Sequence, residues 1–318
     1  MGGDNVNLLN RSLLTLKEFS SDEIAYLLDL SEMVKAEKRK KIVKQRFLGM
    51  TLAMIFEKRS TRTRCAFETA FGEEGGHPVF LSTDDIQLGA KESIEDTARV
   101  LGRMFDAIEF RGYKQETVEI LAKYAGVPVY NGLTDMYHPT QVLADLMTLK
   151  EEFGYLKGLK LVYMGDGRNN MANSLAIGCA KMGIDYVIIS PEELFPDEQY
   201  INEIKEIAKK SGSSITVTSK IEDNIVGADA IYTDVWASMG EEAKALERIR
   251  LLTPYQVNQD IMDMTKNKKC IFMHCLPAVK GQEVSFDVIE GPSSRVWDEA
   301  ENRKHTIKAL MLATLGKA

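Results

Sequence analysis

The chain has 318 residues, of which 44% are hydrophobic and 27% are charged, and these values are typical of a globular protein with two domains. Its net charge of -7 argues against a general nucleic-acid binder, since such proteins carry an excess of basic residues. No apolar run approaches the length of a membrane span and the N-terminus shows no signal-peptide pattern, so we expect a cytoplasmic protein without a membrane partner.

The four cysteines show neither a CxxC pair nor the spacing of metal ligands. They stand at positions 65, 179, 270 and 275. We therefore expect free thiols in a reducing compartment and no metal site.

The first half of the chain is predicted to alternate strands with helices. An amphipathic helix follows the capping box Ser20-x-x-Glu23. The strands predicted after it are 51–56, 79–81, 107–110 and 127–130, and the helices are 61–75, 92–104 and 116–124. This alternation indicates βαβ units and a parallel sheet.

The second half repeats this pattern after a long helix. That helix is expected to begin at Pro139, because the residue before a proline avoids helical geometry, and to end near residue 153. The later elements are predicted as strands 160–164, 186–190, 214–218, 230–233 and 270–273, and as helices 170–182, 198–211 and 298–315.

The predicted fold class is therefore α/β, with two doubly wound parallel-sheet domains and a crevice between them. The predicted boundaries are 1–137 for the first domain, 138–153 for the interdomain helix, 154–297 for the second domain and 298–318 for a C-terminal helix that returns to the first domain. Ligands of such sheets bind beyond the carboxyl ends of the strands, and the motifs below lie there.

The segment FEKRSTRTR, Phe56 to Arg64, lies between a predicted strand and a predicted helix. Free backbone N–H groups and a positive helix dipole are expected at this point, and Ser60, Thr61 and Thr63 add hydroxyl donors. Arginine and lysine side chains hold a dianion well. We interpret the motif, with Arg62 at its centre, as a phosphate cradle without a Gly-rich loop; a solvated basic turn is the alternative.

Two further groups follow strands of the first half. Arg111 comes directly after a predicted strand, where its guanidinium can grip a carbonyl or phosphate oxygen, although a surface salt bridge explains it too. His138 and Gln141 form an H-P-x-Q pattern that places an imidazole and an amide at one helix start. Such a pair can polarise a carbonyl oxygen, and a structural histidine is the alternative.

In the second half, the loop 165–170 (GDGRNN) stands where a dinucleotide fingerprint would stand. Asn170 occupies the third glycine position of that fingerprint, which argues against a dehydrogenase and favours polar contacts to an amino acid. Asp234 and Ser238 follow the predicted strand 230–233. Asp234 can fix an ammonium group, and Ser238 can hold a carboxylate or a second amine. A structural loop around Trp236 is the alternative.

His274 and Cys275 are adjacent, which suggests a thiol nucleophile. Neighbours in an extended chain point in opposite directions, so we expect Cys275 to form a polarisable wall of the site. Arg303, near the C-terminus, would by itself be interpreted as a solvated helix residue.

Taken together, these motifs resemble the ornithine branch of the aspartate/ornithine carbamoyltransferase family. The segments F-x-x-x-S-T-R-T-R, R-G, H-P-T-Q, G-D-x-R-N-N, D-V-W-x-S-M-G, H-C-L-P and E-N-R occur in the expected order over nearly the whole chain. The D-V-W-x-S-M-G element resembles the ornithine loop and is the most specific of them.

The resemblance implies a role for each site residue. The phosphate of carbamoyl phosphate is expected on Ser60, Thr61, Arg62, Thr63 and Arg111. The carbamoyl group is expected among Arg111, His138, Gln141, Arg303 and the Cys275–Leu276 backbone. Gln87 is expected to reach the site of an adjacent subunit. L-Ornithine is expected on Asn170, Asp234, Ser238 and Met239. The residues expected to act in catalysis are Arg62, Arg111, His138, Asp234 and Cys275.

The implied reaction joins L-ornithine to the carbamoyl group through a tetrahedral intermediate and releases L-citrulline and phosphate. It needs no cofactor, and the implied assembly is a homotrimer or a group of trimers. The compact stretch 278–297 favours the forms that act in arginine biosynthesis. Transfer to putrescine or another amine, and a nucleotide-binding Rossmann-type protein, are the alternatives.

Overall fold

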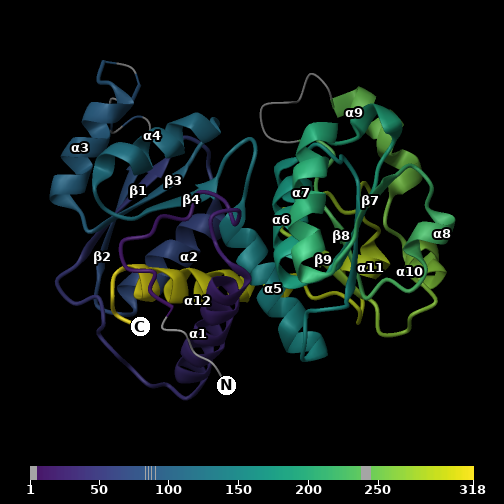
Figure 1. The fold of residues 1–318 in the computed structure, drawn as a ribbon, viewed down its shortest axis with the longest axis horizontal. Coiled ribbons are helices and arrows are strands. Elements are labelled where there is room, and N and C mark those ends of the chain that lie inside the picture. Colours follow the sequence, from purple (N-terminus) through teal and green to yellow (C-terminus); the bar gives the residue numbers. More distant parts are fainter. Residues whose placement is uncertain (1–5, 83, 85, 87, 90, 238–244) are drawn as a thin grey trace. The chain divides into compact units, whose positions relative to one another are not determined.

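The computed structural model describes residues 6–82, 84, 86, 88–89, 91–237 and 245–318 (Figure 1). The chain divides into two compact units, one formed by Met1–Met147 with Glu301–Ala318 and the other by Thr148–Ala300. Each unit contains one wholly parallel sheet covered by helices, which confirms the predicted α/β class.

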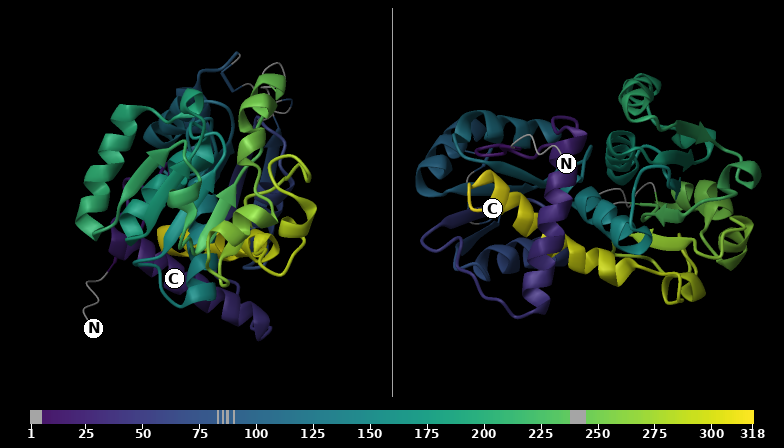
Figure 2. Two further views of the ribbon diagram at one scale, coloured as in Figure 1. Left: turned by 90° about the vertical axis from the view of Figure 1, so that its right-hand side faces the viewer. Right: turned by 60° about the horizontal axis from the view of Figure 1, so that its bottom comes forward.

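The first unit is built on a four-stranded sheet with the strand order β2-β1-β3-β4. Its strands are β1 (Thr51–Phe56), β2 (His77–Ser82), β3 (Ala107–Arg111) and β4 (Val129–Leu133). Its helices are α1 (Ser21–Arg39), α2 (Thr61–Gly72), α3 (Ile94–Met104) and α4 (Gln115–Ala125), with parts of α5 (Pro139–Phe153) and α12 (Val296–Thr314). Helices α3 and α4 cover one face of the sheet, and α1, α2 and α12 lie on the other side (Figures 1 and 2).

The strands of this sheet divide their side chains between its two faces. Ile55, Ile108 and Phe110 pack into the apolar cluster beneath α3 and α4. Because successive strand residues point to opposite faces, Glu109 and Arg111 face the side of α2 and α12. A carboxyl and a guanidinium are thus directed into the interior of the first unit.

The second unit is built on a five-stranded sheet with the order β7-β6-β5-β8-β9. Its strands are β5 (Lys160–Met164), β6 (Asp185–Ile189), β7 (Ile215–Thr218), β8 (Ala230–Thr233) and β9 (Ile271–His274). Its helices include α6 (Asn170–Met182), α7 (Glu198–Ser211), α8 (Glu222–Ile225), α9 (Ala245–Leu252), α10 (Gln259–Met264) and α11 (Phe286–Ile289), besides the short 3-10 turns Glu192–Leu194 and Thr253–Tyr255. Helices α6 and α7 cover one face, and α10 and α11 cover the other (Figure 1).

Most predicted elements occur within a few residues of their expected bounds, and the differences have local causes. Strand β4 begins at Val129 and not at 127, because Pro128 has no N–H to give to a ladder. Helix α2 ends at Gly72, before a turn in which Gly75 has φ +81°. Helices α8 to α11 were not predicted, since four to eight residues are too few to show a helical period.

Among the described residues, no helix combines the length and the apolar character that a membrane span requires.

Candidate active site

The carboxyl ends of β1 and β3 lie side by side at the point where the strand order of the first sheet reverses. Phe56, the last residue of β1, pairs in register with Arg111, the last residue of β3. Ligands of open α/β sheets bind at such a switch point, because the loops that leave it run to opposite faces. The basic motif and Arg111 therefore meet where a ligand is expected.

The motif forms the N-terminus of α2. Ser60 is the N-cap, and its Oγ accepts a hydrogen bond from the backbone N–H of Thr63 at 3.1 Å. The remaining N–H groups of the first turn have no partner within the helix, so this end favours an anion. Ser60 and Arg62 are half-buried, and Thr61 is exposed.

Arg64, the last arginine of the motif, faces another way. It forms an ion pair with Glu68 at 3.0 Å, and its guanidinium lies 3.8 Å from the centre of the Phe80 ring. Arg64 therefore supports α2, while Arg62 is half-buried in the first turn of that helix.

The hydroxyl of Thr63 joins two buried guanidinium groups. Arg111 Nη1 donates to Thr63 Oγ1 at 3.2 Å, and Arg303 Nη2 donates to the same oxygen at 3.1 Å. Arg303 Nη1 also donates to Gln141 Oε1 at 2.8 Å. Arg303 is only 2% exposed, so the interpretation of this residue as a solvated helix residue is wrong.

His138 lies beside this cluster, in the loop that precedes α5, as predicted. Its pKa is lowered well below the usual value, first by burial and then by the positive charges of Arg303, Arg111 and Arg62. The imidazole is therefore neutral at physiological pH and can form a hydrogen bond without adding charge. The first unit thus brings Arg62, Arg111, His138, Gln141 and Arg303 together.

In the second unit, the carboxyl ends of β5 and β8 form the corresponding switch point. Asn169 caps α6, since its Oδ1 accepts from the backbone N–H groups of Met171 and Ala172 at 2.7 and 3.0 Å. Its Nδ2 donates to Asp234 Oδ2 at 2.9 Å. Asn169 was not predicted as a site residue, although the G-D-x-R-N-N motif contained the signal.

Asp234 is held by donors from three segments. Besides Asn169, the backbone N–H of Val235 donates to Oδ1 at 2.8 Å, and Cys275 Sγ lies 3.3 Å from the same oxygen. Asp234 is 7% exposed. These contacts fix the orientation of a carboxylate at the end of β8. Asn170, the residue after Asn169, is half-buried.

The ring of His274 is used within the protein. Its Nδ1 accepts from the backbone N–H of Leu276 at 2.8 Å, so Nε2 carries the hydrogen and donates to Glu283 Oε1 at 3.1 Å. Leu276 has φ +59°, and the bond from His274 holds its backbone in that conformation.

One group of possible metal ligands occurs in the described part of the chain. Asp234, His274 and Cys275 each offer a ligand atom, and these atoms lie within 4.8 Å of one another. The carboxylate and the ring nitrogens already take part in the hydrogen bonds above, so we interpret the group as a polar network and continue to predict no metal.

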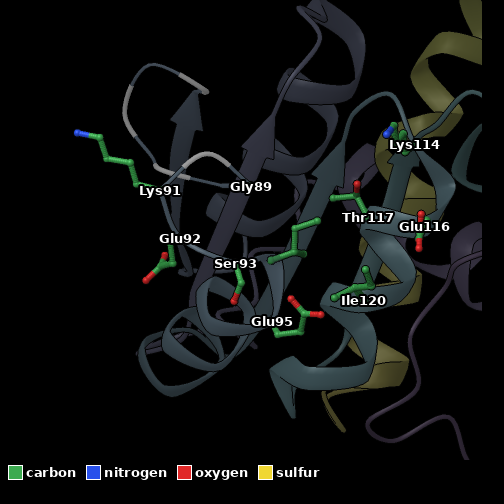
Figure 3. A pocket seen from close by; sticks show the side chains of 10 residues that line it. Gly89, Lys91, Glu92, Ser93, Glu95, Lys114, Glu116, Thr117 and Ile120 are labelled. Carbon is green, nitrogen blue, oxygen red and sulfur yellow. The ribbon is translucent and has the colours of Figure 1, made fainter.

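Three predicted site residues, Gln87, Ser238 and Met239, lie outside the described residues. A pocket of about 480 Å³ does open near the described neighbours of Gln87, between α3 and α4 (Figure 3). Lys91 and Lys114 lie at its two sides, and Glu95 lies between them (Figure 3). None of the predicted site residues lines this pocket.

Comparisons with known proteins identify the family of both units. Residues 11–151 match the family model "Aspartate/ornithine carbamoyltransferase, carbamoyl-P binding domain", and residues 157–314 match "Aspartate/ornithine carbamoyltransferase, Asp/Orn binding domain". The chain is 75% identical over 309 residues to the ornithine carbamoyltransferase of Caldanaerobacter subterraneus, covering 97% of this chain and 99% of that one. It is 56% identical over 329 residues to a catabolic ornithine carbamoyltransferase of Bacillus licheniformis, covering 98% of each.

Among solved structures, the chain is similar to the ornithine carbamoyltransferase of Pyrococcus furiosus. The TM-score is 0.94 at 47% sequence identity, and the match covers 98% of this chain and 99% of that one.

Proposed function

Since the chain belongs to the aspartate/ornithine carbamoyltransferase family, we propose that the side chains gathered in each unit hold one substrate of the reaction. The reaction itself is the transfer of the carbamoyl group of carbamoyl phosphate to L-ornithine, giving L-citrulline and phosphate.

The phosphate group binds at the N-terminus of α2, on Ser60, Thr61, Arg62, Thr63 and Arg111. The observation that carries this proposal is the convergence of Arg111 and Arg303 on the hydroxyl of Thr63, at 3.2 and 3.1 Å. Two buried guanidiniums next to a helix N-terminus form an environment that an anion stabilises. A phosphate dianion at this position offsets the positive charge of the guanidiniums.

The carbamoyl group lies among Arg111, His138, Gln141 and Arg303, with the Cys275–Leu276 backbone as a further contact. The oxyanion of the tetrahedral intermediate is stabilised by Arg62, Arg111 and His138. The orientation of the Gln141 amide is fixed by two hydrogen bonds. Its Nε2 donates to Asp145 Oδ1 at 2.8 Å, and its Oε1 accepts from Arg303. Donors fixed before the reaction stabilise the oxyanion of a tetrahedral intermediate without reorganising.

Ornithine binds through Asn170, Asp234, Ser238 and Met239. Asp234, held by Asn169, Val235 and Cys275, is a suitable partner for an ammonium group of the amino acid. The side-chain amine must lose its proton before it attacks, since its pKa in water keeps it charged. The neutral amine then attacks the carbamoyl carbon and forms the new C–N bond. The C–O bond to phosphate breaks, and phosphate leaves as an anion that the arginines already hold and carries away the proton that the attacking nitrogen releases.

The finer features of the assembly follow the family resemblance. We propose a homotrimer or a group of trimers, in which Gln87 reaches the site of the adjacent subunit, and a cytoplasmic location. We propose that the reaction acts in arginine synthesis. Relatives from Bacillus carry the name catabolic.

The decisive experiment is the variant Arg62→Ala in a citrulline-forming assay. Removing one charged donor of the transition state should lower kcat/KM by about 10²- to 10³-fold, or about 3 kcal/mol. Arg64→Ala is the matched control, because Arg64 contacts Glu68 and Phe80, and its kcat/KM should change by less than about 3-fold. An unchanged kcat/KM in Arg62→Ala would defeat the phosphate assignment.

A further inference from the structure

Glu109 is a buried acid that the reaction described above does not use. It stands in the middle of β3 with 0% exposure, and its side chain faces the same side of the sheet as that of Arg111. Among the described residues, neither of its carboxyl oxygens has a hydrogen-bond partner. A buried carboxyl without partners is costly, so its presence requires an explanation.

The carboxyl lies at the floor of the phosphate cradle. A Cβ added to Gly132 in β4 would collide with Glu109 Oε1 and would also come within 3.1 Å of Thr63 Cγ2. Gly132 therefore leaves the space that the carboxyl occupies, directly beside Thr63. Thr63 is the residue on which Arg111 and Arg303 converge.

In the described part of the chain, two charged groups act electrostatically on Glu109, and both belong to the cradle. They are Arg111, from the same strand, and Arg303, from α12. Two further titratable groups belong to the cluster. His138 is kept neutral by burial and by the same arginines, so it does not compete for a proton at physiological pH. Asp145, on α5, is buried and accepts a hydrogen bond from Gln141 Nε2 at 2.8 Å.

The charge of the cradle changes when an anion binds. Burial raises the pKa of Glu109 well above its usual value, and the positive charges of Arg111 and Arg303 act in the opposite direction. A dianion bound by these guanidiniums offsets their charge and repels an ionised carboxyl, so it must raise the pKa of Glu109 further. Binding of the anion and protonation of the acid then favour one another.

We propose that Glu109 is a proton-linked positioning residue of the phosphate cradle, whose carboxyl is ionised as counter-charge in the empty site at alkaline pH and protonated when the dianion is bound. The proton comes from the buffer, and no bond of the substrate changes in this step. This inference rests on the proposed phosphate site. It predicts that anion binding takes up a proton and weakens as the pH rises.

The test uses sulfate, a dianion that does not itself titrate between pH 6 and pH 9.5. Calorimetric titrations of the full chain in two buffers with different ionisation enthalpies measure the number of protons taken up. In the wild type, up to about one proton should be taken up per sulfate at alkaline pH, and the affinity should fall by up to about 10-fold per pH unit there.

Glu109→Gln is the informative variant, since the amide has nearly the same shape and cannot titrate. Its sulfate affinity should be independent of pH over this window. The KM for carbamoyl phosphate should rise at alkaline pH in the wild type, because anion binding weakens there, and should not rise in this variant. Glu301→Gln is the control, because Glu301 is on α12 two residues before Arg303, but its side chain is 50% exposed and pairs with His305. This variant should keep the proton uptake of the wild type.

The outcomes separate this inference from the site on which it depends. Sulfate binding by the wild type without proton uptake at any pH in the window would overturn the role of Glu109, whether or not Glu109→Gln folds. The same pH dependence in wild type and Glu109→Gln would do so too. Retention of sulfate binding and activity by Arg62→Ala would instead count against the phosphate site itself.

Discussion

A single hydroxyl group, that of Thr63, accepts hydrogen bonds from two guanidiniums that lie 48 and 240 residues away in the sequence. Each of these arginines would be expensive to bury alone, because desolvation of a charge costs several kcal/mol. The shared acceptor offsets part of this desolvation cost. For Arg303, the additional hydrogen bond to Gln141 offsets a further part. The phosphate proposed to bind there would offset the rest, so we expect the cluster to select anions.

A third buried histidine, His305 on α12, gives a prediction about stability. Burial lowers its pKa to about 4, against the opposing effect of Glu301, whereas the unfolded chain has the ordinary value of about 6.5. The unfolded state therefore binds a proton that the folded state excludes, so stability falls as the pH drops below about 6.5 toward 4. His305→Gln should remove about 2 kcal/mol of that loss.

Urea unfolding at pH 7 and pH 4.5 measures this effect as the difference between the two pH values for each protein. The comparison cancels the titration of carboxylates that both proteins share. If the variant loses as much stability on acidification as the wild type, His305 is not the group responsible.

At the scale of the element, the first turn of α6 serves both the fold and the site. The Oδ1 of Asn169 accepts from the N–H groups of Met171 and Ala172, while its Nδ2 holds Asp234. Asparagine is suited to this position because one side chain carries both an acceptor and a donor. The cap of the helix therefore also orients the proposed ligand of ornithine.

Two substitutions of Asn169 should separate these functions. Asn169→Ser keeps a capping oxygen but loses the donor to Asp234, so the KM for ornithine should rise about 10-fold with little change in stability. Asn169→Ala loses both and should also destabilise the protein by about 1 kcal/mol. Steady-state kinetics, with putrescine as a second acceptor for comparison, measure the change in the KM for ornithine. Thermal unfolding measures the change in stability of each variant. Equal kinetics in Asn169→Ser and the wild type would remove Asn169 from the site.

Helix α12 is the element that completes the first unit. Its Lys304 and Lys308 donate to the carboxylate of Glu73 at 2.6 and 3.2 Å, and Asn302 accepts from Lys35 of α1 at 2.7 Å. Despite the opposing effect of burial, these lysines and Lys38 hold the pKa of Glu73 near 2. The ion pairs fix the rotation of α12, which in turn directs Arg303 inward.

At the scale of the molecule, the two units carry different ligand chemistry. The first unit offers guanidiniums and a helix N-terminus, and the second offers a carboxylate with its hydrogen-bond donors. Phosphate alone should therefore slow amide exchange at residues 61–64, at the start of α2, by at least about 10-fold at saturation, and leave residues 170–173 unchanged.

Hydrogen exchange followed by mass spectrometry would test this division between units. Arg62→Ala should show no protection by phosphate at the concentration that protects the wild type. Protection that appears at the start of α6 and not at α2 would show that the half-sites have been assigned to the wrong units.

The sequence by itself determined the order and type of the main elements, the position of most motifs after strand ends, and the resemblance to the family. These features are readable because they depend on local periodicity, on helix capping and on residue types at short spacing. Helix α6, for example, occupies the predicted residues 170–182.

Only the tertiary structure decided that Arg303 is buried against Thr63, that Asn169 reaches Asp234, and that Glu109 lies beneath the cradle. Each of these contacts joins segments that are distant in the chain, and local pattern contains no information about which distant side chains share a face. Their meeting is fixed by strand order and by the burial of apolar faces, which are properties of the folded chain as a whole.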